Sequence, residues 1–245
     1  MGGFLLSLLI GTTNAAKGRE LVGLLGPLGF AVKTLRDMPP APDVVEDGDT
    51  FAANARKKAA AYARHFDAWV LADDSGLEVD ALNGRPGVFS ARYAGPNASD
   101  ADNNARLLAE LADRPEAQRG AGYYCHVALA DPSGEIRAES TGTCRGRISM
   151  AEVGTNGFGY DPLFFVREFH QTFGQLGPSV KAAISHRARA MRAIVPHICN
   201  LAAAGHWHSQ RHSEASSDRA HASLTAEYQQ KEPLPGDKPA AAPMK

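Results

Sequence analysis

Strand-like and helix-like segments alternate along residues 1–204 and predict an α/β domain with a central mixed sheet flanked by helices. Three observations lead to this prediction. The apolar run at residues 4–10 is typical of a buried strand, residues 50–66 have the pattern of an amphipathic helix, and Asp-Pro-Ser-Gly at 131–134 joins two strand-like segments as a hairpin.

The other elements follow in chain order. Leucines with helical spacing come after the first strand, and the helix at 50–66 has Thr50 as its expected N-cap and Phe51, Ala55, Ala59, Tyr62, Ala63 and Phe66 along one face. We further expect a short buried strand at 68–72, a helix at 103–111, hairpin strands at 123–130 and 135–142, and a long helix at 180–204 that is interrupted or kinked near Pro196.

Charge and composition exclude several classes of protein. The 245 residues include 26 Lys and Arg against 27 Asp and Glu, which argues against a nucleic-acid partner. No apolar run reaches the roughly 18 residues that a membrane span needs, and the run at 4–10 lacks the preceding basic residues of a signal peptide. We therefore expect a cytoplasmic protein without a membrane partner. Cys125, Cys144 and Cys199 are interpreted as small buried side chains in a reducing compartment.

Composition changes near Gly205, and residues 205–245 are predicted to form a disordered tail. Leu224 and Leu234 are its only large aliphatic residues, and its five basic and five acidic residues balance. Three histidines near its start are also compatible with a metal-binding tract, but no Cys or carboxylate cluster accompanies them, which favours a solvated extension.

The turn between the first strand and the following helix has the composition of an anion-binding site. Thr12, Thr13 and Asn14 offer small polar side chains next to free N–H groups at a helix start, and Lys17 adds a positive charge. The spacing is not that of a Walker loop. An ordinary capped turn between strand and helix is the alternative.

Two adjacent carboxylates, Asp73 and Asp74, come directly after the predicted strand at 68–72 and are expected to emerge at the edge of the sheet. Such a pair is costly unless a cation compensates it, and it suits Mg²⁺ that binds phosphates. Glu46, in the acidic segment 44–49, is a candidate to complete the set, although a solvated loop is the alternative for this residue.

Cationic and aromatic residues supply the rest of the candidate site. Lys58 falls on the apolar stripe of its helix, where it either snorkels or points at the acidic site, while Lys57 faces elsewhere. Glycines around Phe158 and Tyr160 suggest aromatic faces exposed for stacking on a base, with a packed aromatic loop as the alternative. The later helix brings together Lys181, Ser185, His186 and Arg187.

Together these motifs resemble one family, the inosine triphosphate pyrophosphatases, also described as dITP/XTP or non-standard purine nucleoside triphosphate pyrophosphatases. The matching segments cover residues 12–21, 50–55, 71–95, 157–165 and 181–190 in the family's order. The resemblance implies a long curved sheet, two lobes around a substrate cleft, and usually a homodimer. It also implies hydrolysis of ITP, dITP and XTP to the nucleoside monophosphate and pyrophosphate, which cleanses the nucleotide pool, with one Mg²⁺ per subunit.

The resemblance assigns a role to each matching residue. Asp74 matches the catalytic base and, with Glu46, the magnesium ligands. The substrate-binding positions of the family are matched by Thr12, Thr13, Asn14, Lys17, Lys58, Ser75, Phe158, Gly159, Tyr160, Asp161, Lys181, His186 and Arg187. Two positions depart from the family: Ala53 and Gln175 stand where acidic residues are expected. The first departure either weakens the metal shell or removes a capping-box glutamate.

Three rival functions differ from this one in features of the sequence. A haloacid-dehalogenase-type phosphatase needs Asp-x-Asp after its first strand, which Asp73-Asp74-Ser75 does not provide. A sibling pyrophosphatase acting on modified pyrimidine or other nucleotides would differ only in the base pocket. A non-catalytic nucleotide sensor is disfavoured because the Lys, Glu, Asp and His set is complete.

Overall fold

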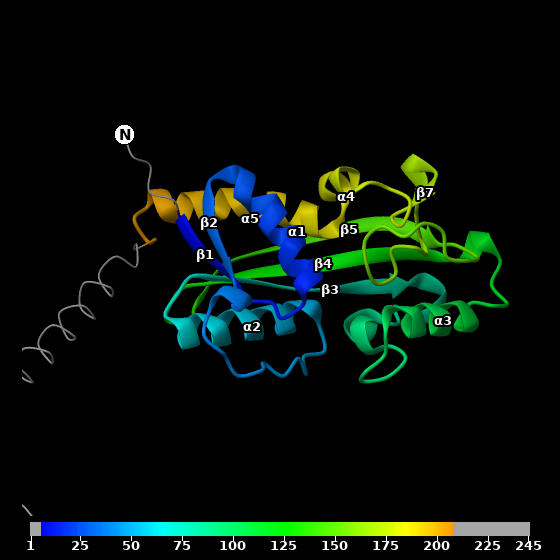
Figure 1. Ribbon diagram of the computed structural model, residues 1–245, viewed down its shortest axis with the longest axis horizontal. Helices are drawn as coiled ribbons and strands as arrows, with labels where there is room; N and C mark the ends of the chain where they lie inside the picture. The colour runs from blue at the N-terminus through cyan, green and yellow to red at the C-terminus, as the bar shows by residue number, and fades with distance from the viewer. Residues whose placement is uncertain (1–5, 208–245) are drawn as a thin grey trace, which may run out of the picture. The chain divides into compact units, whose positions relative to one another are not determined.

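A seven-stranded sheet in the order β2-β1-β3-β4-β5-β6-β7 organises the computed structural model, which describes residues 6–207 (Figure 1). β1 is parallel to β2 and β3, and every later pairing is antiparallel, so the predicted mixed sheet is confirmed. The strands are β1 Leu6–Ile10, β2 Phe30–Thr34, β3 Val70–Val79, β4 Gly120–Ala130, β5 Ile136–Ile148, β6 Phe164–Val166 and β7 Gln171–Thr172.

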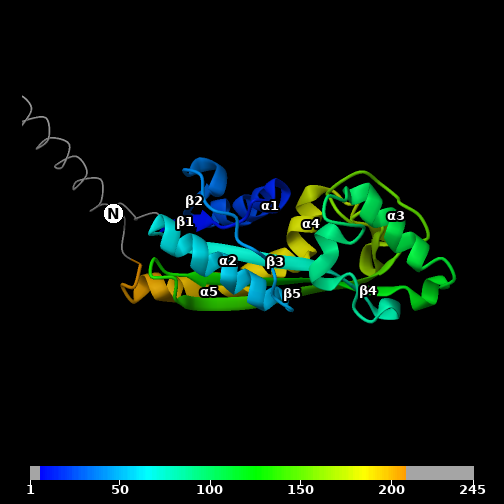
Figure 2. The same ribbon diagram turned by 90° about the horizontal axis from the view of Figure 1, so that it is seen from below.

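Helices cover both faces of the sheet. α2 packs on β3 and β4, whereas α5 packs on β4 and β5 from the opposite face, with α1 beside it (Figures 1 and 2). The α-helices are α1 Ala15–Leu25, α2 Phe51–Phe66, α3 Asp100–Glu110, α4 Pro178–Ile184 and α5 His186–Ala203. Short 3₁₀ turns are η1 Gly26–Leu28, η2 Leu35–Asp37, η3 Asp80–Leu82, η4 Gly87–Arg92, η5 Glu116–Gln118 and η6 Arg167–Phe169. No described helix is long and apolar enough to cross a membrane.

The apolar core forms three clusters that define two lobes. One cluster lies between the sheet and α1 with α5, and includes Leu21, Leu71 and Ile194. A second lies between the sheet and α2. The third surrounds the distal ends of β3, β4 and β5, where Phe164 and Phe173 pack with Tyr123. The first two clusters therefore support one lobe and the third supports the other.

The N-cap of helix α2 and the face that it turns to the core agree with the sequence prediction. The Thr50 hydroxyl accepts a hydrogen bond from the Ala53 N–H at 3.1 Å, which satisfies one of the free donors of the first turn. The Lys58 side chain is only 7% exposed, whereas that of Lys57 is 44% exposed and pairs with Asp47. The expected inward direction of Lys58 is confirmed.

Three predictions about elements were wrong or incomplete. The strand expected at 68–72 is the start of the ten-residue β3, so Asp73 and Asp74 lie inside a strand rather than after it. The last helix is broken at Ser185, whose extended backbone and hydroxyl cap α5, and it continues as a helix through Pro196. Strand β2 was not anticipated, although it pairs with β1 over five residues.

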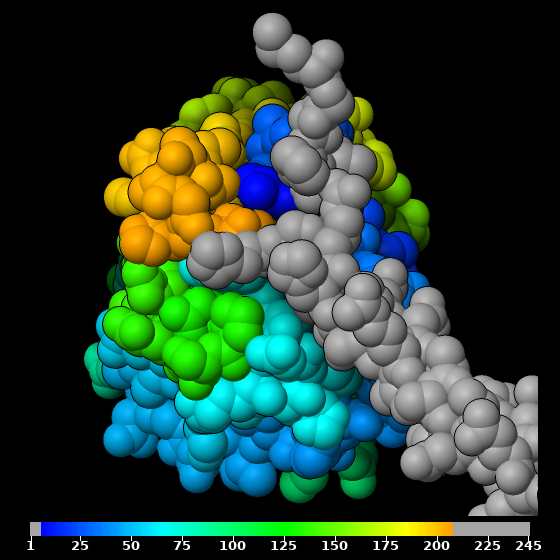
Figure 3. All heavy atoms as spheres, turned by 90° about the vertical axis from the view of Figure 1, so that its left-hand side faces the viewer, coloured from blue at the N-terminus to red at the C-terminus, as the bar shows by residue number. Residues whose placement is uncertain are grey.

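Figure 3 shows the end of α5 next to the turn between β4 and β5, and Gly134 of that turn lies against Ala60 and Arg64 of α2. Beyond α5, Trp207 stacks on Trp69 with ring centroids 4.2 Å apart, so described structure continues three residues past position 204. The rest of the predicted tail, 208–245, lies outside the described residues. Cys125 and Cys144 are buried as expected, but Cys199 is exposed on α5.

Candidate active site

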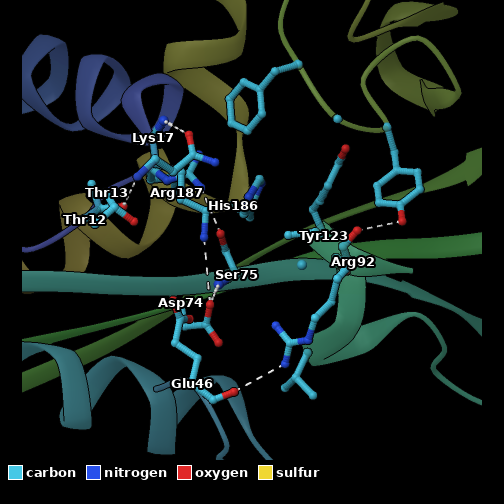
Figure 4. A pocket seen from close by; sticks show the side chains of 18 of the residues that line it. Thr12, Thr13, Lys17, Glu46, Asp74, Ser75, Arg92, Tyr123, His186 and Arg187 are labelled. Carbon is cyan, nitrogen blue, oxygen red and sulfur yellow. Dashed lines mark hydrogen bonds and ion pairs between the residues drawn. The ribbon is translucent and has the colours of Figure 1, made fainter. Parts of the chain in front are cut away.

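One pocket of about 500 Å³ lies between the two lobes, and every residue to which the family resemblance assigns a role lines it, whereas the candidates Asp73 and Ser185 do not. From the lobe of α1 and α2 come Thr12, Thr13, Asn14, Lys17, Glu46 and Lys58; β3 contributes Asp74 and Ser75; the later part of the chain contributes Phe158, Gly159, Tyr160, Asp161, Lys181, His186 and Arg187. Figure 4 shows several of them converging on β3.

The pocket opens where β1 stops pairing with β3. β1 contacts β3 only through Leu9 with Val70 and Ile10 with Leu71, while β4 accompanies β3 along its whole length. Beyond Leu71, no strand among residues 6–207 pairs along this edge of β3, and only an isolated bridge joins Glu78 to Pro86. Because consecutive strand residues point to opposite faces, Asp73 and Asp74 leave this edge in opposite directions.

Asp74 points to the α2 side and into the pocket. One carboxylate oxygen accepts a hydrogen bond from Asn54 Nδ2 at 3.1 Å, and the other lies 3.5 Å from Lys58 Nζ and 3.8 Å from Lys17 Nζ. Burial raises the pKa of Asp74 above its ordinary value, although Lys58 and Lys17 oppose the rise. A buried carboxylate with a raised pKa is suited to accept a proton.

Lys58 joins Asp74 to the acidic loop. Its ammonium is 2.8 Å from Glu46 Oε2, so one cation reaches both Glu46 and Asp74 and the two carboxylates face a common space. Burial would lower the pKa of Lys58, but the carboxylates of Asp74, Asp73 and Glu46 together raise it. Asn54 ties the same loop to α2 because its side-chain oxygen accepts a hydrogen bond from the Gly48 N–H at 2.8 Å.

Asp73 points to the α5 side, is fully buried and does not line the pocket. Its carboxylate lies 3.2 Å from Arg187 Nε and 3.8 Å from Lys17 Nζ. Burial would raise the pKa of Asp73, but Lys17 and Arg187 together hold it well below its ordinary value. Asp73 is therefore a permanent anion that holds Arg187, which in turn donates to Ser75 Oγ at 2.8 Å. The adjacency of Asp73 and Asp74 also suggests that Asp73 could assist Asp74 as a base, but this buried, paired position does not fit such a role.

The turn before α1 is both a cap and a wall of the pocket. Asn14 Oδ1 accepts hydrogen bonds from the N–H groups of Ala16 and Lys17 at 2.9 and 3.1 Å. Thr12 Oγ1 accepts from the Asn14 N–H at 3.2 Å. The two interpretations of this segment, capped turn and pocket wall, are thus compatible.

The opposite end of the pocket is aromatic and cationic. Lys181 Nζ lies 4.5 Å from the centroid of the half-buried Phe158 ring and pairs with the buried Asp161, which also accepts from the Phe158 N–H at 2.8 Å. Burial raises the pKa of Asp161 despite Lys181. Tyr160 was expected to expose its ring, but it is only 3% exposed and donates its hydroxyl to the Ser90 carbonyl at 2.8 Å.

His186 is a buried residue of the lining at the aromatic end of the pocket. Its ring stacks on Tyr123 at 4.7 Å, and its Nδ1 has no hydrogen-bond partner within the described chain. Burial, reinforced by Arg187 and Lys181, lowers the pKa of His186 well below its ordinary value. The imidazole is therefore neutral near pH 7, and its buried Nδ1 remains unpaired among the described residues.

Sequence reasoning missed several residues that support the site. Glu20 pairs with Lys181 at 2.8 Å and with Arg187, and its position three residues after Lys17 on α1 was the available signal. Tyr123 and Asn54 are recognisable only once the strands and helices are assembled. The two departures lie outside the pocket: Ala53 is exposed in the first turn of α2, and Gln175 accepts from the Thr172 N–H at 3.0 Å. The loss at 53 is thus that of a capping-box residue.

A family model described as the Ham1 family matches residues 8–197. A dITP/XTP pyrophosphatase of Rhodopirellula baltica is 52% identical over 194 residues, which cover 79% of this chain and 93% of that protein. One from Geobacter sulfurreducens is 48% identical over 191 residues, covering 78% and 96%. A solved HAM1 protein from Coxiella burnetii superposes with a TM-score of 0.72 at 36% identity, covering 80% of this chain and all of that one.

Asp73 yields a stability prediction. Asp73→Asn leaves the buried Arg187 guanidinium without its anion on β3 and should lower the unfolding free energy at pH 7 by about 3 kcal/mol. The pKa of Asp73 is lower in the folded protein than in the unfolded chain, where it is about 3.9. The stabilisation that the Asp73 carboxylate provides is therefore complete above this unfolded-state pKa and decreases as pH falls from it toward the folded-state pKa. Urea unfolding at pH 7 and pH 3 should therefore show a large difference from wild type that narrows in acid.

The exposed Asp47→Asn serves as the matched control and should not change stability at either pH. Equal stability of Asp73→Asn and wild type at pH 7, or a difference that does not depend on pH, would contradict the anchoring role of Asp73.

Proposed function

This chain belongs to the Ham1 family, and on that premise we propose that it hydrolyses non-standard purine nucleoside triphosphates such as dITP, ITP and XTP to the monophosphate and pyrophosphate. The observation that carries the proposal is a single pocket with Glu46, Lys58 and Asp74 at one end and Phe158, Lys181 and His186 at the other. The first group can bind a phosphate chain and includes a proton acceptor, Asp74. The second group can bind a purine base.

The donor set fits a magnesium ion bound together with substrate phosphates. Mg²⁺ is usually held by one or two carboxylates plus substrate oxygens and waters, and Glu46 and Asp74 face a common space. No group of three or more His, Cys, Asp or Glu side chains within residues 6–207 forms a metal cage. When bound, the ion would neutralise phosphate charge; Glu46 and Asp74 would hold it.

Asp74 is proposed as the base that orients and deprotonates the attacking water. Asn54 fixes one of its oxygens, and burial raises its pKa toward the range in which a carboxylate accepts a proton effectively. Lys17 and Lys58 are proposed to offset charge on the phosphates, since phosphoryl transfer depends mostly on positioning and electrostatics.

The base pocket is proposed to prefer a 6-oxo purine. Phe158 offers a stacking face that accepts any base, so selectivity must come from polar groups at the base edge. Lys181 and Arg187 are fixed donors, and the neutral His186 has a free ring nitrogen. A donor facing the 6-amino group of adenine would remain unpaired.

The family resemblance also supports a homodimer and a cytoplasmic location as proposals. Gel filtration of the full chain tests the first of these directly.

The role of Asp74 is tested by Asp74→Asn. The amide keeps the size of the side chain but neither accepts the water proton nor binds magnesium well, so kcat should fall by at least about 10²-fold. Steady-state pyrophosphate release from ITP at saturating Mg²⁺ measures this. Asp47→Asn, which removes an exposed carboxylate of the same acidic loop, should keep wild-type turnover; near-normal turnover by Asp74→Asn would refute the role.

Base preference is tested with ITP, dITP, XTP, GTP and ATP under the same conditions. We expect kcat/KM for ITP, dITP and XTP to exceed that for ATP by at least about 10²-fold, because a site built on hydrogen bonds rejects a substrate that leaves them unpaired. Comparable efficiency on ATP would exclude a role in cleansing the nucleotide pool. Preference for a modified pyrimidine nucleotide would favour the sibling activity instead.

A further inference from the structure

Arg92 differs from the other cationic side chains of the pocket because it has no carboxylate partner among residues 6–207. Five Lys and Arg side chains line the pocket. Lys17, Lys58, Lys181 and Arg187 each form ion pairs with Asp or Glu. Within the described chain, Arg92 forms no ion pair and donates only to the main-chain oxygen of Glu46, at 3.3 Å.

The half-buried guanidinium is held in place by neutral contacts. It lies 5.2 Å from the centroid of the Phe89 ring, and the backbone on both sides of it is held by Asn103 of α3. Asn103 Nδ2 donates to the Ala91 carbonyl at 3.3 Å, and Asn103 Oδ1 accepts from the Ala94 N–H at 2.8 Å. A positive charge is thus positioned at the pocket without being neutralised by the protein.

The turn η4, which carries Arg92, forms a wall that connects the two ends of the pocket. Ser90 accepts the Tyr160 hydroxyl at the aromatic end, whereas Arg92 reaches Glu46 at the acidic end. Figure 4 places Arg92 across the pocket from Thr12, Thr13 and Lys17, with Asp74 and Glu46 between them. The Arg92 guanidinium therefore lies at the acidic end of the pocket, away from the aromatic end and on the side opposite the turn before α1.

We propose that Arg92 binds the phosphates that leave as pyrophosphate, closing the phosphate site from the side opposite Lys17. The proposal rests on the proposed function, because it assumes that a nucleotide lies with its base at Phe158. Arginine suits this position since its planar fork donates two parallel hydrogen bonds to phosphate oxygens and stays charged at every working pH. The four paired cations are already partly neutralised, whereas Arg92 offers a full charge.

The experiment measures binding of two products separately by titration calorimetry on the full chain. Magnesium pyrophosphate probes the phosphate end, and inosine monophosphate probes the base end. Wild type is compared with Arg92→Ala, Arg92→Lys and Arg85→Ala; the last removes an exposed arginine of the same lobe that pairs with Glu110 and does not line the pocket.

Arg92→Ala should bind magnesium pyrophosphate about 10- to 100-fold more weakly, the effect of losing a charged hydrogen-bond donor. Arg92→Lys should fall between it and wild type because it keeps the charge but loses the fork. Inosine monophosphate binding should stay within about twofold in both variants, and Arg85→Ala should match wild type for both products. If Arg92 only stabilised the local structure, Arg92→Ala would weaken the binding of both products.

Unchanged pyrophosphate binding in Arg92→Ala, or an equal loss for inosine monophosphate, would overturn the proposal. Because binding is measured without turnover, its failure is distinguishable from failure of the proposed function. The latter would appear as a wild-type protein that releases no pyrophosphate from any nucleotide.

Discussion

The pleat of β3 beyond the end of β1 is the constraint on which the rest of the site depends. Because β1 pairs with β3 at only two positions, β3 continues without a neighbouring strand among residues 6–207 on that side, and its side chains alternate between two helical layers. Asp73 meets Arg187 on the α5 side, and Asp74 meets Asn54 and Lys58 on the α2 side. Two adjacent carboxylates that would repel one another in a loop thus acquire separate environments.

These environments give the two carboxylates different chemistry. The pKa of Asp73 is driven down by Lys17 and Arg187, while that of Asp74 is raised by burial. Fixing buried charges is costly unless each is paired, and the lining cations of both lobes, apart from Arg92, are paired in this way. The side chains of the pocket are therefore held in place by one another before a ligand binds.

The periodicity of the sequence predicted correctly those features that depend on a single helix or strand. It failed for features that depend on contacts between two or more elements. The spacing of the α2 residues placed Lys58 inward correctly because a helix face is fixed by the sequence alone. Asp-Asp-Ser-Gly suggested a loop, yet it continues a strand because Lys17, Arg187 and Lys58, which come from three helices, compensate its charges. The last helix breaks at Ser185 rather than near Pro196, since a serine hydroxyl can cap a new helix, whereas the effect of a proline depends on its packing. Every site residue suggested by the family resemblance lies in one pocket. Asn54 and Arg92 become visible only in the folded chain, and the spacing from Lys17 on α1 was the only sequence signal for Glu20.

We infer that Asp74 directs water to the α-phosphorus of a nucleotide whose pyrophosphate leaves toward the acidic end of the pocket. Hydrolysis of ITP in water enriched in ¹⁸O, followed by mass spectrometry of both products, tests it most directly. Attack at the α-phosphorus places one ¹⁸O atom in inosine monophosphate and none in pyrophosphate. Label in pyrophosphate, or release of orthophosphate instead, would contradict it.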